Sequence, residues 1–245
     1  MSVSLLLAWY KFELKNLLRN KMTVVMIFYP LILGWLGRHL IVNNLVPDEA
    51  LALTAMLMTV LVGFAYGAMA GFSLLDDRDD QVLLSIQISP VPLNLYIWFK
   101  ITFAYIFALV GGFFIVWFSG AIMLSAGDIL LIAALSALQT PITAFLVNAF
   151  AHNKVEGFVT MKASGFLLLF PIGSFFFLDA KEWLFAIAPA FWAAKAVQHA
   201  ILQPLINTGL ISMNLSFYQY ITVGLLYNLL LVAATFHLFR KKNQL

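Results

Sequence analysis

Six apolar stretches alternate with polar breaks along the chain. Most are about 20 residues or longer, the length a helix needs to cross a hydrocarbon core of about 30 Å, whereas barrel strands would be about 10 residues with alternating polarity. The pattern predicts an all-α, polytopic membrane protein with six transmembrane helices. We expect these helices at 22–42, 51–75, 93–124, 129–150, 163–178 and 217–239.

The longest polar break runs from 74 to 100. It opens with four carboxylates, at Asp76, Asp77, Asp79 and Asp80. Each would cost about 2.5–3.5 kcal/mol in hydrocarbon, so the segment must lie in water. Apolar and polar positions then mix, and Pro90 and Pro92 prevent a helix from continuing into the next span. We predict a short amphipathic helix outside the membrane at 76–90, with the acidic residues at its N-terminus, where the helix dipole favours them.

Two other segments are predicted to lie at the membrane surface. Residues 1–21 mix leucines and aromatic residues with basic ones, which predicts an interfacial helix; the alternative is a solvated start to the first span. From 183 to 215, Pro189 and Pro204 interrupt the apolar residues, which predicts one or two re-entrant or interfacial helices. We expect Lys195 in this segment to snorkel toward water rather than to contact a substrate.

Small residues and a proline indicate how the spans pack. Gly63, Gly67 and Gly71 recur every four residues, which lets a neighbouring helix approach closely. We expect that neighbour to come from the same chain; a subunit interface is the alternative. Pro141 predicts a kink in the span at 129–150.

Composition and charge fix the class and the orientation. Hydrophobic residues make up 63% of the 245 and charged residues 10%, and the mean hydropathy is +0.95, values outside the range of soluble domains. Eleven of the 14 basic residues fall on the side of the termini and three on the other side. The positive-inside rule therefore places both termini and the acidic break in the cytoplasm. The chain has no cysteine, which excludes disulfides and thiolate metal sites.

Candidate chemistry is sparse. Asp76 to Asp80 contains the D-D-x-x-D arrangement with which membrane prenyltransferases hold magnesium and a diphosphate, but the other inner loop offers only Glu156 as a second acidic ligand. The four histidines are isolated, and no G-x-x-x-x-G-K-[ST] motif for ATP occurs. We therefore predict no enzyme activity and no catalytic, metal or cofactor site in this chain, and no nucleic-acid partner. A prenyltransferase-like enzyme and a stand-alone carrier remain the alternatives, although the predicted spans lack the mid-membrane charges typical of carriers.

Four segments resemble type-2 ABC exporter permeases. ELKNLLRNKMTVVMIFYPLIL at 13–33 resembles the connecting helix and first span of that family, and DDRDDQVLLSIQISPVPLNLYIWFK at 76–100 resembles its first cytoplasmic loop. HNKVEGFVTMKASGFLLLFPIGSFFF at 152–177 is similar to a later N-K-x-E-G segment, and APAFWAAKA near Pro189 to the outer re-entrant region. The chain departs from the commoner first-loop pattern, which has Gly-Thr-Leu where this sequence has Gln81-Val82-Leu83.

The resemblance implies a permease subunit of a bacterial cell-membrane exporter for a hydrophobic or amphipathic substrate, a drug or a peptide. It also implies a second permease subunit, identical or related, and two separate ATP-binding subunits that hold ATP and magnesium. The segment at 76–90 would be the coupling helix, and Asn153, Lys154 and Glu156 would form a second, shorter contact. The residues expected to contact the ATPase are Asp77, Asp79, Gln81, Leu83, Leu84, Ser85, Gln87, Ser89, Asn153, Lys154 and Glu156.

Overall fold

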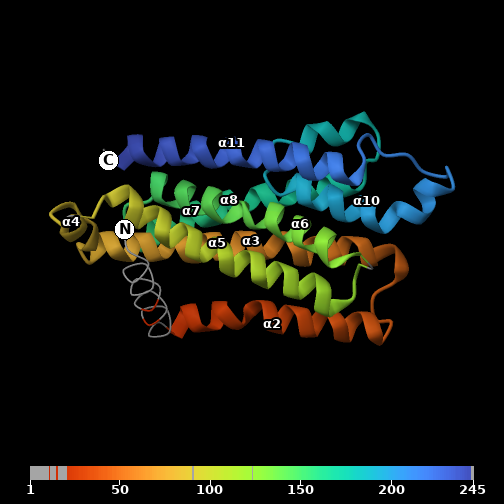
Figure 1. Ribbon diagram of the computed structural model, residues 1–245, viewed down its shortest axis with the longest axis horizontal. Coiled ribbons are helices and arrows are strands. Elements are labelled where there is room, and N and C mark those ends of the chain that lie inside the picture. Colours follow the sequence, from red (N-terminus) through yellow and green to blue (C-terminus); the bar gives the residue numbers. More distant parts are fainter. Residues whose placement is uncertain (1–10, 12–14, 16–20, 90, 123, 244–245) are drawn as a thin grey trace.

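The computed structural model describes residues 11, 15, 21–89, 91–122 and 124–243 (Figure 1). Within these ranges the regular secondary structure is helical, without β-strands. Six helical segments are long and apolar enough to cross a membrane: Val24–Val42, Ala50–Asp79, Leu93–Ser119, Ala126–Phe150, Lys154–Phe175 and Phe217–Asn243. The prediction of an all-α protein with six transmembrane helices is confirmed. The predicted interfacial helix at 1–21 lies almost entirely outside the described residues, as does Pro90.

The α-helices are α2 (Lys21–Val42), α3 (Asp48–Asp79), α4 (Val82–Gln87), α5 (Leu93–Ser119), α6 (Ala126–Ala137), α7 (Gln139–Phe150), α8 (Lys154–Gly165), α9 (Leu169–Phe175), α10 (Phe191–Asn207) and α11 (Phe217–Asn243). Two 3-10 helices, η1 (Phe166–Leu168) and η2 (Ala180–Phe185), complete the described elements.

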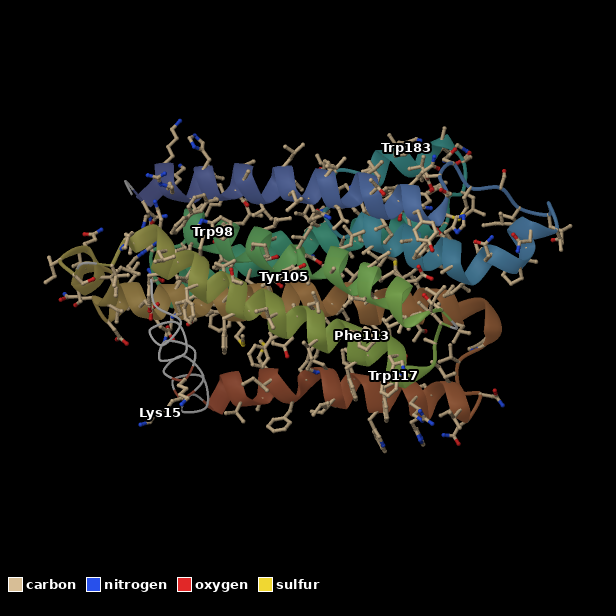
Figure 2. The ribbon with its side chains drawn as sticks, in the orientation of Figure 1. Lys15, Trp98, Tyr105, Phe113, Trp117 and Trp183 are labelled. Carbon is tan, nitrogen blue, oxygen red and sulfur yellow. The ribbon has the colours of Figure 1, made fainter. Side chains whose placement is uncertain are left out.

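The spans form an elongated bundle with two distinct ends (Figure 1). We call the end that carries α4 and the C-terminus of α11 the α4 end, and the opposite end, with η2 and α10, the α10 end. Figure 2 shows Trp98 in the half toward the α4 end, and Trp117 and Trp183 toward the α10 end. The most apolar window of α6–α7 is 78% buried and that of α8–α9 only 11% buried, so α6–α7 is central and α8–α9 peripheral.

The glycines of α3 bring α3 into close contact with the span formed by α6 and α7. A Cβ atom added to Gly63 would lie 2.3 Å from the carbonyl oxygen of Ser136, and one added to Gly67 would lie 2.7 Å from Cβ of Thr143. Real Cβ atoms do not approach so closely, so these positions require glycine. The predicted use of the glycine stripe, close packing within one chain, is confirmed.

Three side-chain hydrogen bonds reinforce this contact at a constant register. The Ser136 hydroxyl donates to the Thr59 carbonyl at 2.7 Å, and Thr140 donates to the Gly63 carbonyl at 3.0 Å. Farther along, the Asn148 amide donates to the Gly71 carbonyl at 2.9 Å, and all three pairs are 77 residues apart in sequence. A constant offset means that α3 and the span formed by α6 and α7 run parallel. The hydrogen bonds between them extend from the middle of the bundle to the α4 end.

Several span boundaries differ from the sequence prediction, and the largest difference is at the fifth span, which begins at Lys154 rather than at 163. α5 ends at Ser119 rather than near 124, because Gly120 adopts a left-handed conformation with φ of +68° that terminates the helix. The next helix then begins at Ala126, where the Ser125 hydroxyl caps it by accepting from the Asp128 amide. The kink predicted at Pro141 appears as the break between α6 and α7 at Leu138, since proline cannot donate to the carbonyl four residues earlier.

Candidate functional site

The acidic residues of the long polar break belong to a different helix from the one predicted. α3 continues through Asp76 and Asp77 to Asp79, so the carboxylates lie at a helix C-terminus and not at an N-terminus. Gln81, with φ of +58°, then turns the chain, and the amphipathic helix is only Val82–Gln87. The predicted coupling helix at 76–90 was therefore too long, because the prediction treated the carboxylates as unpaired.

Lysines from other helices neutralise two of these carboxylates. The Lys100 ammonium of α5 lies 2.5 Å from Oδ2 of Asp77, which also accepts a hydrogen bond of 2.9 Å from the Tyr96 hydroxyl. The Lys154 ammonium of α8 lies 2.8 Å from Oδ1 of Asp76. These ion pairs remove the electrostatic penalty of acids at the negative end of the helix dipole, which explains why α3 continues through them.

Arg78, which lies between the two pairs of aspartates, contacts two further helices. The Arg78 guanidinium donates to the Ala151 carbonyl at 2.9 Å, at the C-terminus of α7, and to the side-chain oxygen of Asn243 on α11. The positive charge satisfies a helix C-terminus that has no intrahelical donor. We define the α3-end cluster as Asp76, Asp77, Arg78, Tyr96, Lys100, Lys154 and Asn243.

Burial separates the predicted contact residues of this region into two groups. Asp77 is 7% exposed and Leu83 is 9% exposed, because the first faces Lys100 and the second packs into the bundle. Both side chains therefore face the bundle in the isolated chain, and their predicted contact with an ATPase stays a prediction. By contrast, Leu84 is 58% exposed and Ile88 is 91% exposed.

The exposed residues form a small surface at the tip of the molecule (Figure 1). We call this the α4 surface, made of Asp79, Asp80, Gln81, Leu84, Ser85, Gln87 and Ile88. Ser89 is half-buried, and its hydroxyl donates to the Ile86 carbonyl, which closes the C-terminal turn of α4. Sequence reasoning omitted Ile88, because an alternating apolar pattern alone does not tell which apolar residues face the bundle.

The second predicted contact lies at the exposed N-terminus of α8. The Asn153 side chain accepts a 3.0 Å hydrogen bond from the Glu156 amide, and a Glu156 carboxylate oxygen accepts one of 2.8 Å from the His152 amide. This reciprocal cap fixes the turn in which Lys154 sits. Lys154 in turn pairs with Asp76, so the structure joins the two predicted contact regions through one ion pair.

The arrangement gives no geometric support to a magnesium-diphosphate site. Among the described residues, no group of three or more histidine, aspartate or glutamate side chains could hold a metal ion. Asp76 and Asp77 each face a lysine on a different helix.

A second polar cluster lies at the α10 end. Lys195 on α10 is fully buried and lies 2.8 Å from Oε2 of Glu182, whose other oxygen accepts 2.7 Å from the Tyr220 hydroxyl. Lys195 also donates to the Phe177 carbonyl at 2.6 Å and to Gln198 at 2.9 Å. We call Glu182, Lys195, Gln198 and Tyr220 the α10-end cluster.

The sequence predicted that Lys195 would snorkel toward water. The structure instead buries its side chain completely, so this prediction is wrong. Burial lowers the pKa of Lys195 from its ordinary value, and the Glu182 carboxylate opposes that shift. The first half of α10 is buried among the spans, and its last turns lie at the end of the bundle.

Comparisons with known proteins bear on what this architecture does. The model of a family described as "Fluoroquinolones export permease protein Rv2686c-like" matches residues 13–236. Two curated relatives, the fluoroquinolones export permease proteins MT2760 and Rv2686c of two Mycobacterium tuberculosis strains, are each 30% identical to this chain over 207 residues. The alignment covers 82% of this chain and 75% of each relative. No solved structure matches.

Proposed function

Because the chain belongs to the Rv2686c-like family of fluoroquinolones export permease proteins, we propose that it is the permease subunit of an ATP-driven exporter. The observation that carries this proposal is the α4 surface. Its two apolar side chains, Leu84 and Ile88, are exposed beyond the spans, beside the exposed carboxylates of Asp79 and Asp80. A short helix with an exposed apolar ridge outside the membrane is suited to a groove on another protein.

The proposed partners are two ATP-binding subunits and a second permease subunit, identical or related. The sequence contains no Walker A motif, so in this proposal ATP and magnesium bind to the separate ATPase. Close packing of α3 on α7 fills the centre of this bundle, which favours a translocation path at the boundary between two permease subunits.

The proposed orientation places the α4 end in the cytoplasm of a bacterial cell, together with both termini. The argument is the distribution of basic residues, because Lys154, Lys162, Arg240, Lys241 and Lys242 lie in the helices at that end. An ATPase that binds the α4 surface would then meet cytoplasmic ATP.

The proposed substrate is an amphipathic drug, with fluoroquinolones as the first candidates because the relatives are named as their exporters. A planar aromatic drug needs apolar and aromatic contacts along its path. Phe166 and Phe176, on and just after the peripheral span, are largely exposed and would supply such contacts at a subunit boundary. A hydrophobic peptide remains the alternative substrate.

The experiment is co-purification with the candidate ATPase subunits of the source bacterium. The double variant Leu84→Asp/Ile88→Asp places charges on the apolar ridge, so we expect the complex to be lost and the ATPase to elute separately. Both side chains are exposed, so the isolated permease should elute unchanged. Leu83→Asp would be a poor test, because Leu83 is buried.

Leu210→Asp is the matched control, because Leu210 is 74% exposed but lies in the loop after α10, at the opposite end. We expect this variant to retain the complex. Unchanged assembly of the Leu84→Asp/Ile88→Asp variant would contradict the proposed docking surface.

A further inference from the structure

Three consecutive side chains at the end of α3 point to three different parts of the bundle. Asp76 pairs with Lys154 of α8, and Asp77 pairs with Lys100 of α5. Arg78 contacts both α7 and α11. One helical turn thus connects α3 with four other helices, and α4 begins four residues after Arg78.

The connection to α5 is the most buried of the three. Lys100 is 3% exposed, and Asp77 also accepts from Tyr96, which lies one turn before Lys100 on the same face of α5. A charge pair held this far from water resists separation, because moving either group alone would leave an uncompensated buried charge. Any displacement of the end of α3 must therefore carry the start of α5 with it.

The connection to α7 and α11 closes a ring of hydrogen bonds. Arg78 donates to Asn243 of α11, and the Asn243 amide donates to the Asn148 carbonyl of α7 at 3.0 Å. The Asn148 side chain then donates to the Gly71 carbonyl, which lies on α3 two turns before Arg78. The ends of α3, α7 and α11 are consequently fixed to one another at the same level of the bundle.

The ring begins at Arg78, four residues before the start of α4. Leu83 is buried where α4 packs against α3 and α5. A force on Leu84 or Ile88 is therefore applied to the two helices that the Asp77–Lys100 pair joins.

We propose that Asp77, Lys100, Arg78 and Asn243 are positioning residues that transmit displacement of α4 to the ends of α5, α7 and α11. The inference rests on the proposed function, in which an ATPase displaces α4. It goes beyond that function by assigning transmission to these four residues, whose side chains are buried or half-buried at the end of the bundle.

Single reporter cysteines test this inference without knowledge of the substrate. The chain has no cysteine, so Ser85→Cys on α4 and Lys241→Cys on α11 each introduce one thiol at a position that is exposed in the isolated permease. The measurement is the rate of labelling by a charged maleimide in the complex with a cysteine-free ATPase, with and without ATP and vanadate. In the otherwise unmodified chain we expect nucleotide to change the rate at both positions, about threefold or more.

The test variants break the cluster and leave the α4 surface intact. In Arg78→Gln, and in the neutral double variant Asp77→Asn/Lys100→Met, we expect nucleotide to change labelling at Ser85→Cys but no longer at Lys241→Cys. The double variant leaves no unpaired buried charge, so it keeps the test valid if a single substitution impairs folding. Lys181→Met is the control, since Lys181 pairs with Asp179 in an exposed contact at the α10 end.

The outcomes distinguish a failure of the transmission role from a failure of the proposed ATP-driven function. If nucleotide changes labelling at Lys241→Cys equally in the test variants and in the unmodified chain, the transmission role is wrong. The same conclusion holds if nucleotide affects only the α4 reporter in the unmodified chain. If neither reporter responds in an assembled unmodified complex, the proposed ATP-driven function fails, and the transmission role fails with it.

Discussion

The two ends of the bundle use the same three chemical groups for different purposes. At the α4 end, Asp77 accepts from Lys100 and Tyr96; at the α10 end, Glu182 pairs with Lys195 and accepts from Tyr220. Each cluster holds a carboxylate between an ammonium group and a phenol.

The difference lies in burial and in what adjoins each cluster. Both charges at the α10 end are fully buried, and their partners come from η2, α10 and α11. At the α4 end the cluster has an exposed member, Lys154, and α4 begins four residues after its Arg78. We infer that the α10-end cluster serves mainly to hold η2 and α10 in the bundle, whereas the α3-end cluster joins the bundle to a surface that a partner can displace.

The largest predicted effect on stability breaks the α10-end cluster. Lys195→Met leaves the Glu182 carboxylate buried without its cation, which is expected to lower the free energy of unfolding by about 3–5 kcal/mol. Thermal unfolding of the purified protein measures this. Adding Glu182→Gln should recover most of the loss, because the double variant removes both charges.

The control for this comparison is Lys181→Met, which removes an exposed cation and should change stability by less than about 0.5 kcal/mol. Equal melting temperatures for Lys195→Met and Lys181→Met would show that the buried pair does not hold the α10 end.

An intermediate effect is expected where α3 packs against the span formed by α6 and α7, between the two clusters. Gly63→Ala places a methyl group 2.3 Å from the Ser136 carbonyl oxygen, so the helices must separate at an expected cost of about 1–3 kcal/mol. Gly112→Ala is the matched control, because its new methyl group would lie 3.6 Å from Ala133, an ordinary contact. Thermal unfolding that ranks the control below Gly63→Ala would contradict the packing argument.

The smallest effect is predicted at the exposed edge of the α3-end cluster. Lys154→Met removes an ion pair whose lysine side chain is 58% exposed, so the free energy of unfolding should fall by no more than about 1 kcal/mol. Denaturation at low and high salt checks the electrostatic origin, since screening should reduce even this small difference. A loss of stability as large as that of Lys195→Met would show that the ion pairs at the two ends of the bundle do not differ in strength.

The sequence predicted the parts of the fold that depend on local pattern. Apolar runs located the six spans, the spacing of Gly63, Gly67 and Gly71 identified the face of α3 that meets another helix, and Pro141 marked the break in its partner. Each of these signals is contained within a few turns of one helix.

The features it did not predict depend on partners far apart in the chain. Asp77 and Lys100 are 23 residues apart, so the sequence alone showed a row of solvated acids where the structure has a neutralised helix end. The signal that could have located this pair is the spacing of Tyr96 and Lys100, one turn apart at the start of an apolar span. For Lys195, no pattern in the sequence indicated that Glu182 would fold back against it.

The most direct test of the central claim is site-specific photo-crosslinking from benzoylphenylalanine placed at Ile88 or at Leu210, in cells that co-express the ATPase. Both positions are exposed, and they lie at opposite ends of the bundle. We predict an adduct with the ATPase from Ile88 and none from Leu210. No adduct from Ile88, or equal adducts from both positions, would contradict the assignment of the α4 surface as the ATPase-binding site.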